Sequence, residues 1–338
     1  MTNISTGDLA RAYLLRHHTS NTKAQLQRLT GELSSGRKAD LGDAVAGDFR
    51  ALAGIEHSLK ALKAYHMAAV EAGMLAGTVQ TALESFQSAA SDVSFKLLAA
   101  GTNGNAIQVR TSASEARRAL FTAASALNVQ TGDRFLLSGA ATDQKPVSGG
   151  QDILDALTIA ISGQTSAAGV TSAITAWFDA PSGGGGYVDI AYDGSQQPLT
   201  PLRIGQDASA SLSLSAADPN LREVLKGLAI GAIVAEGALA GDPVGQARLV
   251  KTAGQTLIAA DGNLTAVRAD VGLVEAQVAD ALTRNGAEAS ALEITRNGII
   301  VADPYGTASD IEAVSTQLQT MYTLTARLSQ LTLANYLK

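Results

Sequence analysis

The side chains that could carry chemistry are few, and the four histidines come first. His17 and His18 adjoin each other, so they point to different faces of a helix. His57 and His66 lack the i, i+4 spacing of a zinc-binding pair, and the sequence contains no HExxH motif. His66 lies on an apolar stripe, where we expect a packed, hydrogen-bonded side chain rather than a metal ligand. These patterns argue against metal catalysis.

Nucleophiles and cofactor-binding loops are equally scarce. The sequence has no cysteine, which excludes disulfides, thiolate metal sites and cysteine nucleophiles, and no serine lies in a G-x-S-x-G motif. The glycine run at 183–186 lacks the Lys-Ser/Thr and the helix that follow a phosphate-binding loop, so a flexible hairpin connection is the better interpretation. We therefore expect no metal, no nucleotide, no organic cofactor and no catalytic centre.

Charge and hydropathy exclude further classes of partner. The net charge is -6, and no cluster of Lys or Arg is longer than Arg117-Arg118, so we expect neither nucleic-acid binding nor attachment to an anionic membrane. The longest apolar run, 227–235, is far shorter than the roughly 20 residues that span a bilayer, and it indicates a buried helix. The first residues lack the basic and apolar regions of a cleaved secretory signal.

The elements that must position any site are mostly helical. Low aromatic content (4%) and low charge content (17%) favour long helices with small side chains. Helical spacing and breaker residues predict helices over 6–33, 43–100, from Ser112 or Ser114 to about 127, 152–161, a helix ending near Trp177, and from Asp218-Pro219 and Asp242-Pro243 onward to a last helix over 309–332. Short β-prone pieces between 133 and 217 include Tyr187 to Tyr192.

These patterns predict a mainly α protein, a long coiled-coil-like bundle formed by both termini with a central β-rich insert. The predicted parts are an N-terminal helical part (1–132), a variable β-rich insert domain (133–217) and a C-terminal helical part (218–338) that ends in a terminal coiled-coil helix. Because helix surrounds the insert on both sides, we expect the two helical parts to form one domain.

Narrow apolar stripes mark the two ends of the chain. One stripe runs through Leu15, Thr22, Leu26, Leu29 and Leu33, and the other through Ile311, Val314, Leu318, Met321 and Leu328, with Leu331 further on. A seam of this kind lets two helices wind around each other, whereas two ordinary amphipathic helices on one core would show the same spacing. We predict an assembly interface at Leu15, Leu26, Leu29, Leu33, Ile311, Val314, Leu318, Met321, Leu328 and Leu331.

Three stretches resemble the bacterial flagellin superfamily. The segment Leu33-Ser34-Ser35-Gly36 and the loop to Gly47 look like the end of the first helix in flagellins and their hook-associated relatives, although Asp43 stands alone where two adjacent acids are usual. Residues 128–147, with Phe135-Leu136-Leu137-Ser138-Gly139, and the final 328–337 are most similar to the hook–filament junction type, the third hook-associated protein.

That resemblance implies a flagellin-like fold and a structural role outside the cell. Such proteins leave through the flagellar type III export apparatus with an export chaperone and without a cleaved signal. Their terminal helices then pair on entering the tube. The implied partners are copies of the chain in a ring or layer, the first hook-associated protein and flagellin. A short flagellin of the filament itself is the alternative within the superfamily, and a helical enzyme or signalling protein is the alternative from another class.

Overall fold

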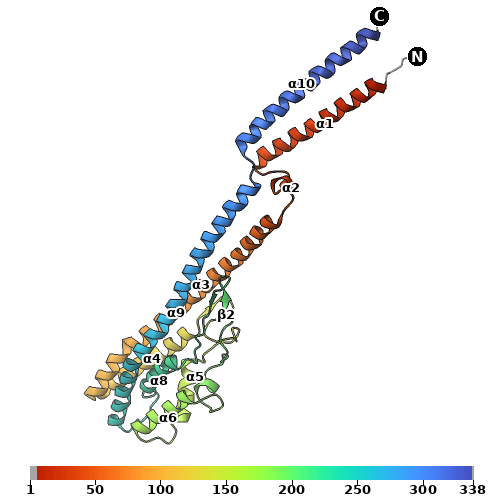
Figure 1. Ribbon diagram of the computed structural model, residues 1–338. Helices are drawn as coiled ribbons and strands as arrows, with labels where there is room; N and C mark the ends of the chain where they lie inside the picture. The colour runs from red at the N-terminus through yellow and green to blue at the C-terminus, as the bar shows by residue number, and fades with distance from the viewer. Residues whose placement is uncertain (1–5, 337–338) are drawn as a thin grey trace. The chain divides into compact units, whose positions relative to one another are not determined.

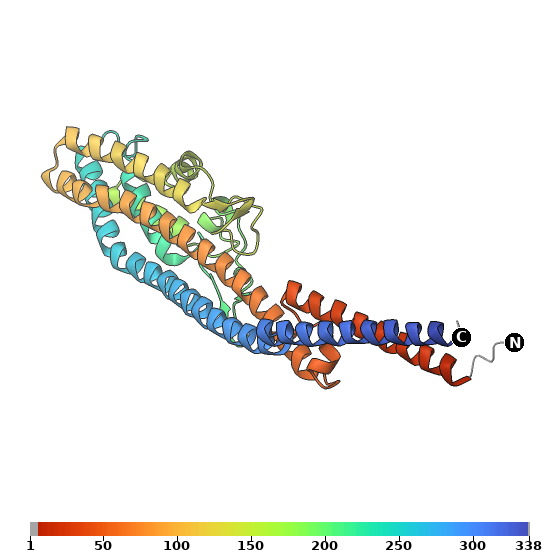
Figure 2. The same ribbon diagram turned by 90° about the horizontal axis from the view of Figure 1, so that it is seen from above.

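The structure is a computed structural model that describes residues 6–336, with side chains over 13–327 (Figures 1 and 2). The prediction of a mainly helical fold with long helices at both termini is confirmed. The helices are α1 (Thr6–Ser35), α2 (Leu41–Ala44), α3 (Arg50–Asn103), α4 (Ala106–Leu127), α5 (Gly150–Ala160), α6 (Ala167–Asp179), α7 (Tyr187–Ile190), α8 (Pro219–Ala232), α9 (Pro243–Ile300) and α10 (Pro304–Tyr336). The strands are β1 (Gln130–Thr131), β2 (Arg134–Phe135), β3 (Leu202–Arg203) and β4 (Ser209–Ala210).

The described chain divides into two compact units. One combines the described parts of Met1–Leu62 and Ala287–Lys338, so segments from both ends of the sequence build it together. The other is the continuous stretch Lys63–Gly286. The predicted insert domain over 133–217, between two helical parts, stays a prediction. Over the described residues, no helix is long and apolar enough to cross a membrane.

Local capping chemistry sets several helix starts where the sequence places them. Asp218 accepts a hydrogen bond from the Asn220 backbone N–H at 2.8 Å, and Pro219, which has no N–H to lose, occupies the first turn of α8. Asp242 accepts from Gly245 N–H at 2.9 Å at the start of α9. Each aspartate satisfies a backbone donor that the helix itself leaves unpaired. The apolar run at 227–235 lies in and just after α8 and is almost entirely buried, as predicted.

The unit Lys63–Gly286 has a core of small side chains between long helices. Figure 2 shows α3, α4 and α9 running along the length of this unit, and α8 lies beside α4. Gly254 of α9 comes so close to α3 that a Cβ there would lie 2.5 Å from Leu98 N, and one at Gly101 of α3 would lie 2.4 Å from Lys251 N. Glycine permits this approach because it has no Cβ. Larger side chains such as Phe86 and Leu97 are fully buried in the same core.

The prediction of a β-rich insert over 133–217 is wrong in its secondary structure. The helices predicted over 152–161 and ending near Trp177 are present as α5 and α6, but each strand there is two residues long, so the segment is mainly helical. Residues 187–190 of the β-prone stretch 187–192 form the short helix α7, and Tyr192 forms an isolated antiparallel bridge with Val147. Tyr187 and Tyr192 are both buried. Six residues cannot separate a period of 2 from one of 3.6. Here the burial of Tyr187 against Trp177 and Phe178 of α6 favours the helix. Trp177 lies in the core.

The glycine run 183–186 is a connection between two helices and not a hairpin. The Asp189 carboxylate accepts backbone N–H groups from Gly183 at 2.9 Å and Gly185 at 2.8 Å. Gly183 and Gly185 both adopt positive φ, which their lack of a side chain allows. The run therefore closes onto its own chain as a loop before α7.

Two helix boundaries also differ from the sequence-based prediction. The helix expected over 43–100 is split, because Ala46 and Gly47 take positive φ between α2 and α3. The helix expected from Ser112 or Ser114 begins instead after Asn105, whose side chain accepts the N–H groups of Ile107 and Gln108. The first boundary depends on backbone conformation inside the predicted helix, and the second on which polar residue acts as the cap.

Candidate assembly interface

The two ends of the chain form an antiparallel helix pair. Figure 1 shows α1 and α10 side by side, and the two helices contact each other along their lengths. Leu29 of α1 and Val314 of α10 are both buried, each with 6% of its surface exposed. Thr22, also buried, directs its Oγ1 toward Sδ of Met321 at 3.8 Å. Apolar stripes that lie almost 300 positions apart in the sequence thus meet in space.

The predicted interface residues differ in how deeply the pair buries them. Leu29 and Val314 are buried, whereas Leu15, Leu26, Ile311, Leu318 and Met321 are half-buried. Leu33 is exposed, at 42%. Leu328 and Leu331 belong to α10, but their side chains lie outside the described residues.

The α1–α10 pair buries few side chains for the length of its two helices. Of the side chains described, only Thr22 and Leu29 of α1 and Thr307 and Val314 of α10 are classed as buried. Isolated helices gain most of their stability from packing an apolar face, and a two-helix contact covers only one narrow stripe. The pair therefore keeps apolar surface available for a further contact.

Several apolar side chains outside the predicted stripes are exposed on the same two helices. Tyr13 and Leu14 of α1, and Tyr322 and Leu324 of α10, each expose about half or more of their surface. Lys23 lies over the Tyr322 ring, with Nζ 5.5 Å from the ring centroid. Sequence reasoning missed these residues because it followed one stripe per helix. The signal that could have found them is an apolar residue directly adjacent in the sequence to a residue of each stripe.

A short backbone bridge ties together the segments that precede α2 and α10. The Lys38 N–H donates to Ile300 C=O at 2.9 Å, and the Ala302 N–H donates to Gly36 C=O at 3.1 Å. Gly36 ends α1 in the left-handed conformation, at φ +67°, as predicted for a glycine at a helix C-terminus. The carboxylate of Glu32 accepts the Ala39 N–H at 2.9 Å. The segment after α1 and the segment between α9 and α10 are therefore joined by backbone hydrogen bonds.

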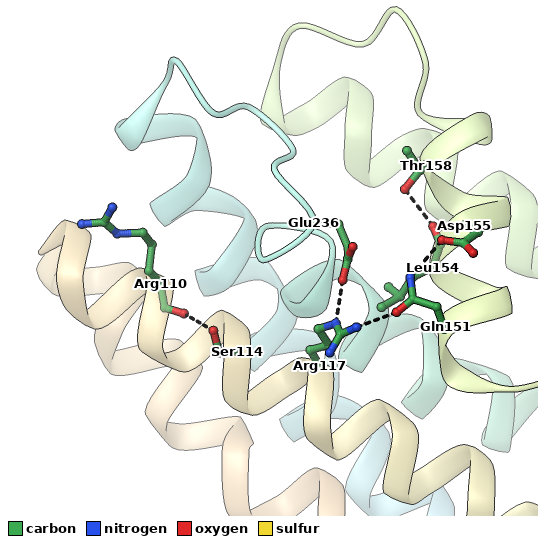
Figure 3. Close-up of polar contacts among 8 residues, drawn as sticks. All are labelled: Arg110, Ser114, Arg117, Gln151, Leu154, Asp155, Thr158 and Glu236. Carbon is green, nitrogen blue, oxygen red and sulfur yellow. Dashed lines mark hydrogen bonds and ion pairs between the residues drawn. The ribbon is translucent and has the colours of Figure 1, made fainter.

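Figure 3 shows a polar cluster centred on Arg117 of α4, in the unit Lys63–Gly286. Arg117 Nε donates to Oε1 of Glu236 at 2.6 Å, and Nη2 donates to Oε1 of Gln151 on α5 at 2.5 Å. The guanidinium also lies 4.6 Å from the ring centroid of Phe121. Gln151 in turn donates to Asp155 Oδ1 at 2.9 Å. Arginine stays protonated at any ordinary pH, so this cluster holds helices together and transfers no proton.

The histidines do not converge. His17, His18, His57 and His66 are all exposed, so the expectation that His66 is a packed core residue is wrong. Leu62 and Ala69, four residues before and three after His66 on α3, are buried, so His66 lies at the edge of a buried stripe rather than inside it. Within the described part of the chain, no group of three or more His, Cys, Asp or Glu could hold a metal ion.

Comparison with known proteins bears on the C-terminal part of the chain. The family described as the bacterial flagellin C-terminal helical region matches residues 256–337, which cover most of α9 and all of α10. A search of curated proteins returns no match. The family match supports a place in the flagellin superfamily, in agreement with the long helices at both ends of the chain.

Proposed function

We propose that this chain is a structural subunit of the bacterial flagellum that assembles through α1 and α10. The observation that carries this proposal is the α1–α10 pair itself. The flagellin match includes α10, and α10 pairs with a helix from the other end of the sequence while apolar side chains on both helices stay exposed. An enzyme would need convergent polar groups in a pocket, whereas a polymer subunit needs helix surface that a neighbour can cover.

Assembly would bury the side chains that one α1–α10 pair leaves half-buried or exposed. In the proposed interface, Leu15, Leu26, Leu318 and Met321 complete their burial against the same helices of neighbouring subunits. Each square ångström of apolar surface removed from water contributes about 25 cal/mol. A narrow stripe is then sufficient, because neighbours complete it. The polymer, rather than the single chain, would hold the terminal helices firmly together.

Within the flagellum we propose a place at the hook–filament junction, outside the cell. The support is the resemblance of residues 128–147 and 328–337 to junction proteins. In this role the chain forms a ring or layer of its own copies between the first hook-associated protein and flagellin. It would reach that position through the type III export apparatus, with an export chaperone.

A flagellin of the filament body is the second candidate. The observation that favours it is the matched family itself, whose description names flagellin. The two candidates share the proposed α1–α10 assembly mechanism. They differ in where growth stops, since a junction subunit adds one limited layer and a flagellin polymerises without limit.

Localisation on intact flagella tests both candidates. We expect a gold-labelled antibody against this chain to mark one point between hook and filament. Label along the whole filament would show that the chain is a flagellin and not the junction adaptor. Absence of label from flagella would overturn both candidates. Seeded polymerisation gives an independent reading, because the adaptor should stop after a short layer on hook fragments.

A further inference from the structure

The turn between α3 and α4 contains a solvent-exposed asparagine, Asn103, that is followed directly by a glycine. The sequence has three Asn-Gly pairs, at Asn103, Asn285 and Asn297. Glycine lacks a Cβ, so its backbone nitrogen can approach the side-chain carbonyl carbon of the preceding asparagine more easily than that of any other residue. Each pair could in principle deamidate, and the fold decides which pair is free to do so.

Two of the three pairs lie inside α9, where the backbone is fixed. Asn285 is buried, and its Nδ2 donates to Ile204 C=O at 2.8 Å. Asn297 is exposed, but it lies within the last two turns of the helix, and its carbonyl accepts the Val301 N–H at 2.9 Å. A helical backbone aims each N–H along the helix axis toward the carbonyl four residues earlier, and so away from the preceding side chain.

Asn103 is different because the helix ends there. It is the last residue of α3, and Gly104 leaves the helix at φ +70° with open space around its Cα. Both residues are exposed. The Gly104 N–H makes one backbone bond, to Ala100 C=O at 3.0 Å, at the end of the helix. Bonds at a helix end open at much smaller free-energy cost than bonds inside it.

We propose that Asn103 is a site of spontaneous deamidation in the folded protein. The Gly104 nitrogen gives up its proton to solvent and attacks Cγ of Asn103, and the C–N bond of the side-chain amide breaks. The departing nitrogen takes up a proton and leaves as ammonia, and a five-membered succinimide ring remains. Water then opens the ring at one of its two carbonyls, which gives aspartate or isoaspartate at position 103. The reaction uses only water and releases ammonia, so it needs no enzyme and no cofactor.

The structure also indicates where the product would disturb the chain. Gly101 is pressed against α9, since a Cβ there would lie 2.5 Å from Ala247 O, so the turn cannot shift toward that helix. On the other side stands Asn105, whose side chain caps α4 through the N–H groups of Ile107 and Gln108. Isoaspartate adds one carbon to the backbone two residues before this cap. The start of α4 must therefore absorb the change.

Peptide mapping by mass spectrometry tests the proposal on the full chain, aged in mildly alkaline buffer. We expect the acid form to appear at Asn103 about tenfold faster than at Asn285 or Asn297. In a sample unfolded in urea, the three sites should convert at similar rates, which makes the two helical pairs internal controls. Amide hydrogen exchange at Ile107 and Gln108 should be faster in the aged chain.

The matched variant is Asn103→Gln, whose longer side chain would have to close a less favourable six-membered ring. It should abolish conversion at this site and keep the exchange of Ile107 and Gln108 unchanged on ageing. Equal conversion at all three pairs in the folded chain, or conversion at Asn103 only after unfolding, would overturn the inference.

Discussion

At the scale of single residues, glycine decides how closely α3 and α9 pack. A Cβ at Gly254 would meet the backbone of α3 at Leu98 N (2.5 Å) and Ser94 O (2.7 Å), which no side-chain rotation can relieve. Gly262, two turns further along α9, has open space around it. The same substitution should therefore have opposite effects at the two positions.

We predict that Gly254→Ala lowers the free energy of unfolding by about 1–3 kcal/mol, because the two helices must separate. Gly262→Ala should raise it by about 0.5–1 kcal/mol, because alanine loses less conformational entropy in a helix. Urea unfolding followed by circular dichroism measures both. A stabilising Gly254→Ala would show that α3 and α9 do not approach as described.

Asp189 gives a second prediction at this scale, on pH. The backbone N–H groups of Gly183 and Gly185 hold the pKa of this carboxyl below its usual value. Its folded-state pKa is depressed, so its contribution to stability is present above the unfolded value of about 3.9 and is lost as the pH falls through the folded value. We expect Asp189→Asn to be less stable than the wild type at neutral pH and equal to it in strong acid. A difference that is the same at every pH would contradict this assignment.

At the scale of elements, Arg117 joins α4 to α5 and to the segment after α8. We predict that Arg117→Ala lowers the free energy of unfolding by about 1–2 kcal/mol, because Glu236 and Gln151 lose a charged partner. Arg110→Ala on the same helix is the control. The Arg110 side chain donates to the Ala106 carbonyl of its own helix, so its loss should stay within about 0.5 kcal/mol. Equal effects of the two variants in urea unfolding would show that the cluster in Figure 3 adds no stability.

At the scale of the whole molecule, the terminal pair is the proposed point of assembly. We predict that Leu318→Asp abolishes assembly and leaves the isolated chain soluble with its middle part folded. A carboxylate buried between subunits would lose its water without gaining a partner, at several kcal/mol per contact. Leu331→Asp should act in the same way. Cells with either variant should build hooks but release flagellin into the medium.

Gln319→Asp is the matched control, because its exposed position on α10 adds the same charge next to the proposed seam. It should assemble normally. Electron microscopy of flagella and the amount of flagellin in the medium measure the outcome. Normal filaments with Leu318→Asp, or global unfolding of the purified variant, would place Leu318 in an ordinary core.

The sequence alone determined the features that rest on local chemistry. The mainly helical class follows from composition and spacing, and Asp218-Pro219 and Asp242-Pro243 mark helix starts because each cap acts within three residues. The flagellin resemblance was also visible at both ends of the chain, and the family match at 256–337 supports it at the C-terminal end. Local signals need no knowledge of distant partners.

Only the tertiary structure decided what depends on contacts between distant segments. Tyr187 lies in a helix and not in a strand, because burial against α6 outweighs the β-propensity of its six-residue stretch. Gly254 of α9 can approach the backbone of α3 this closely because of what lies in the other helix, which the sequence around it does not reveal. The meeting of Thr22 with Met321 is of the same kind, since periodicity defines a face of a helix but not what covers it.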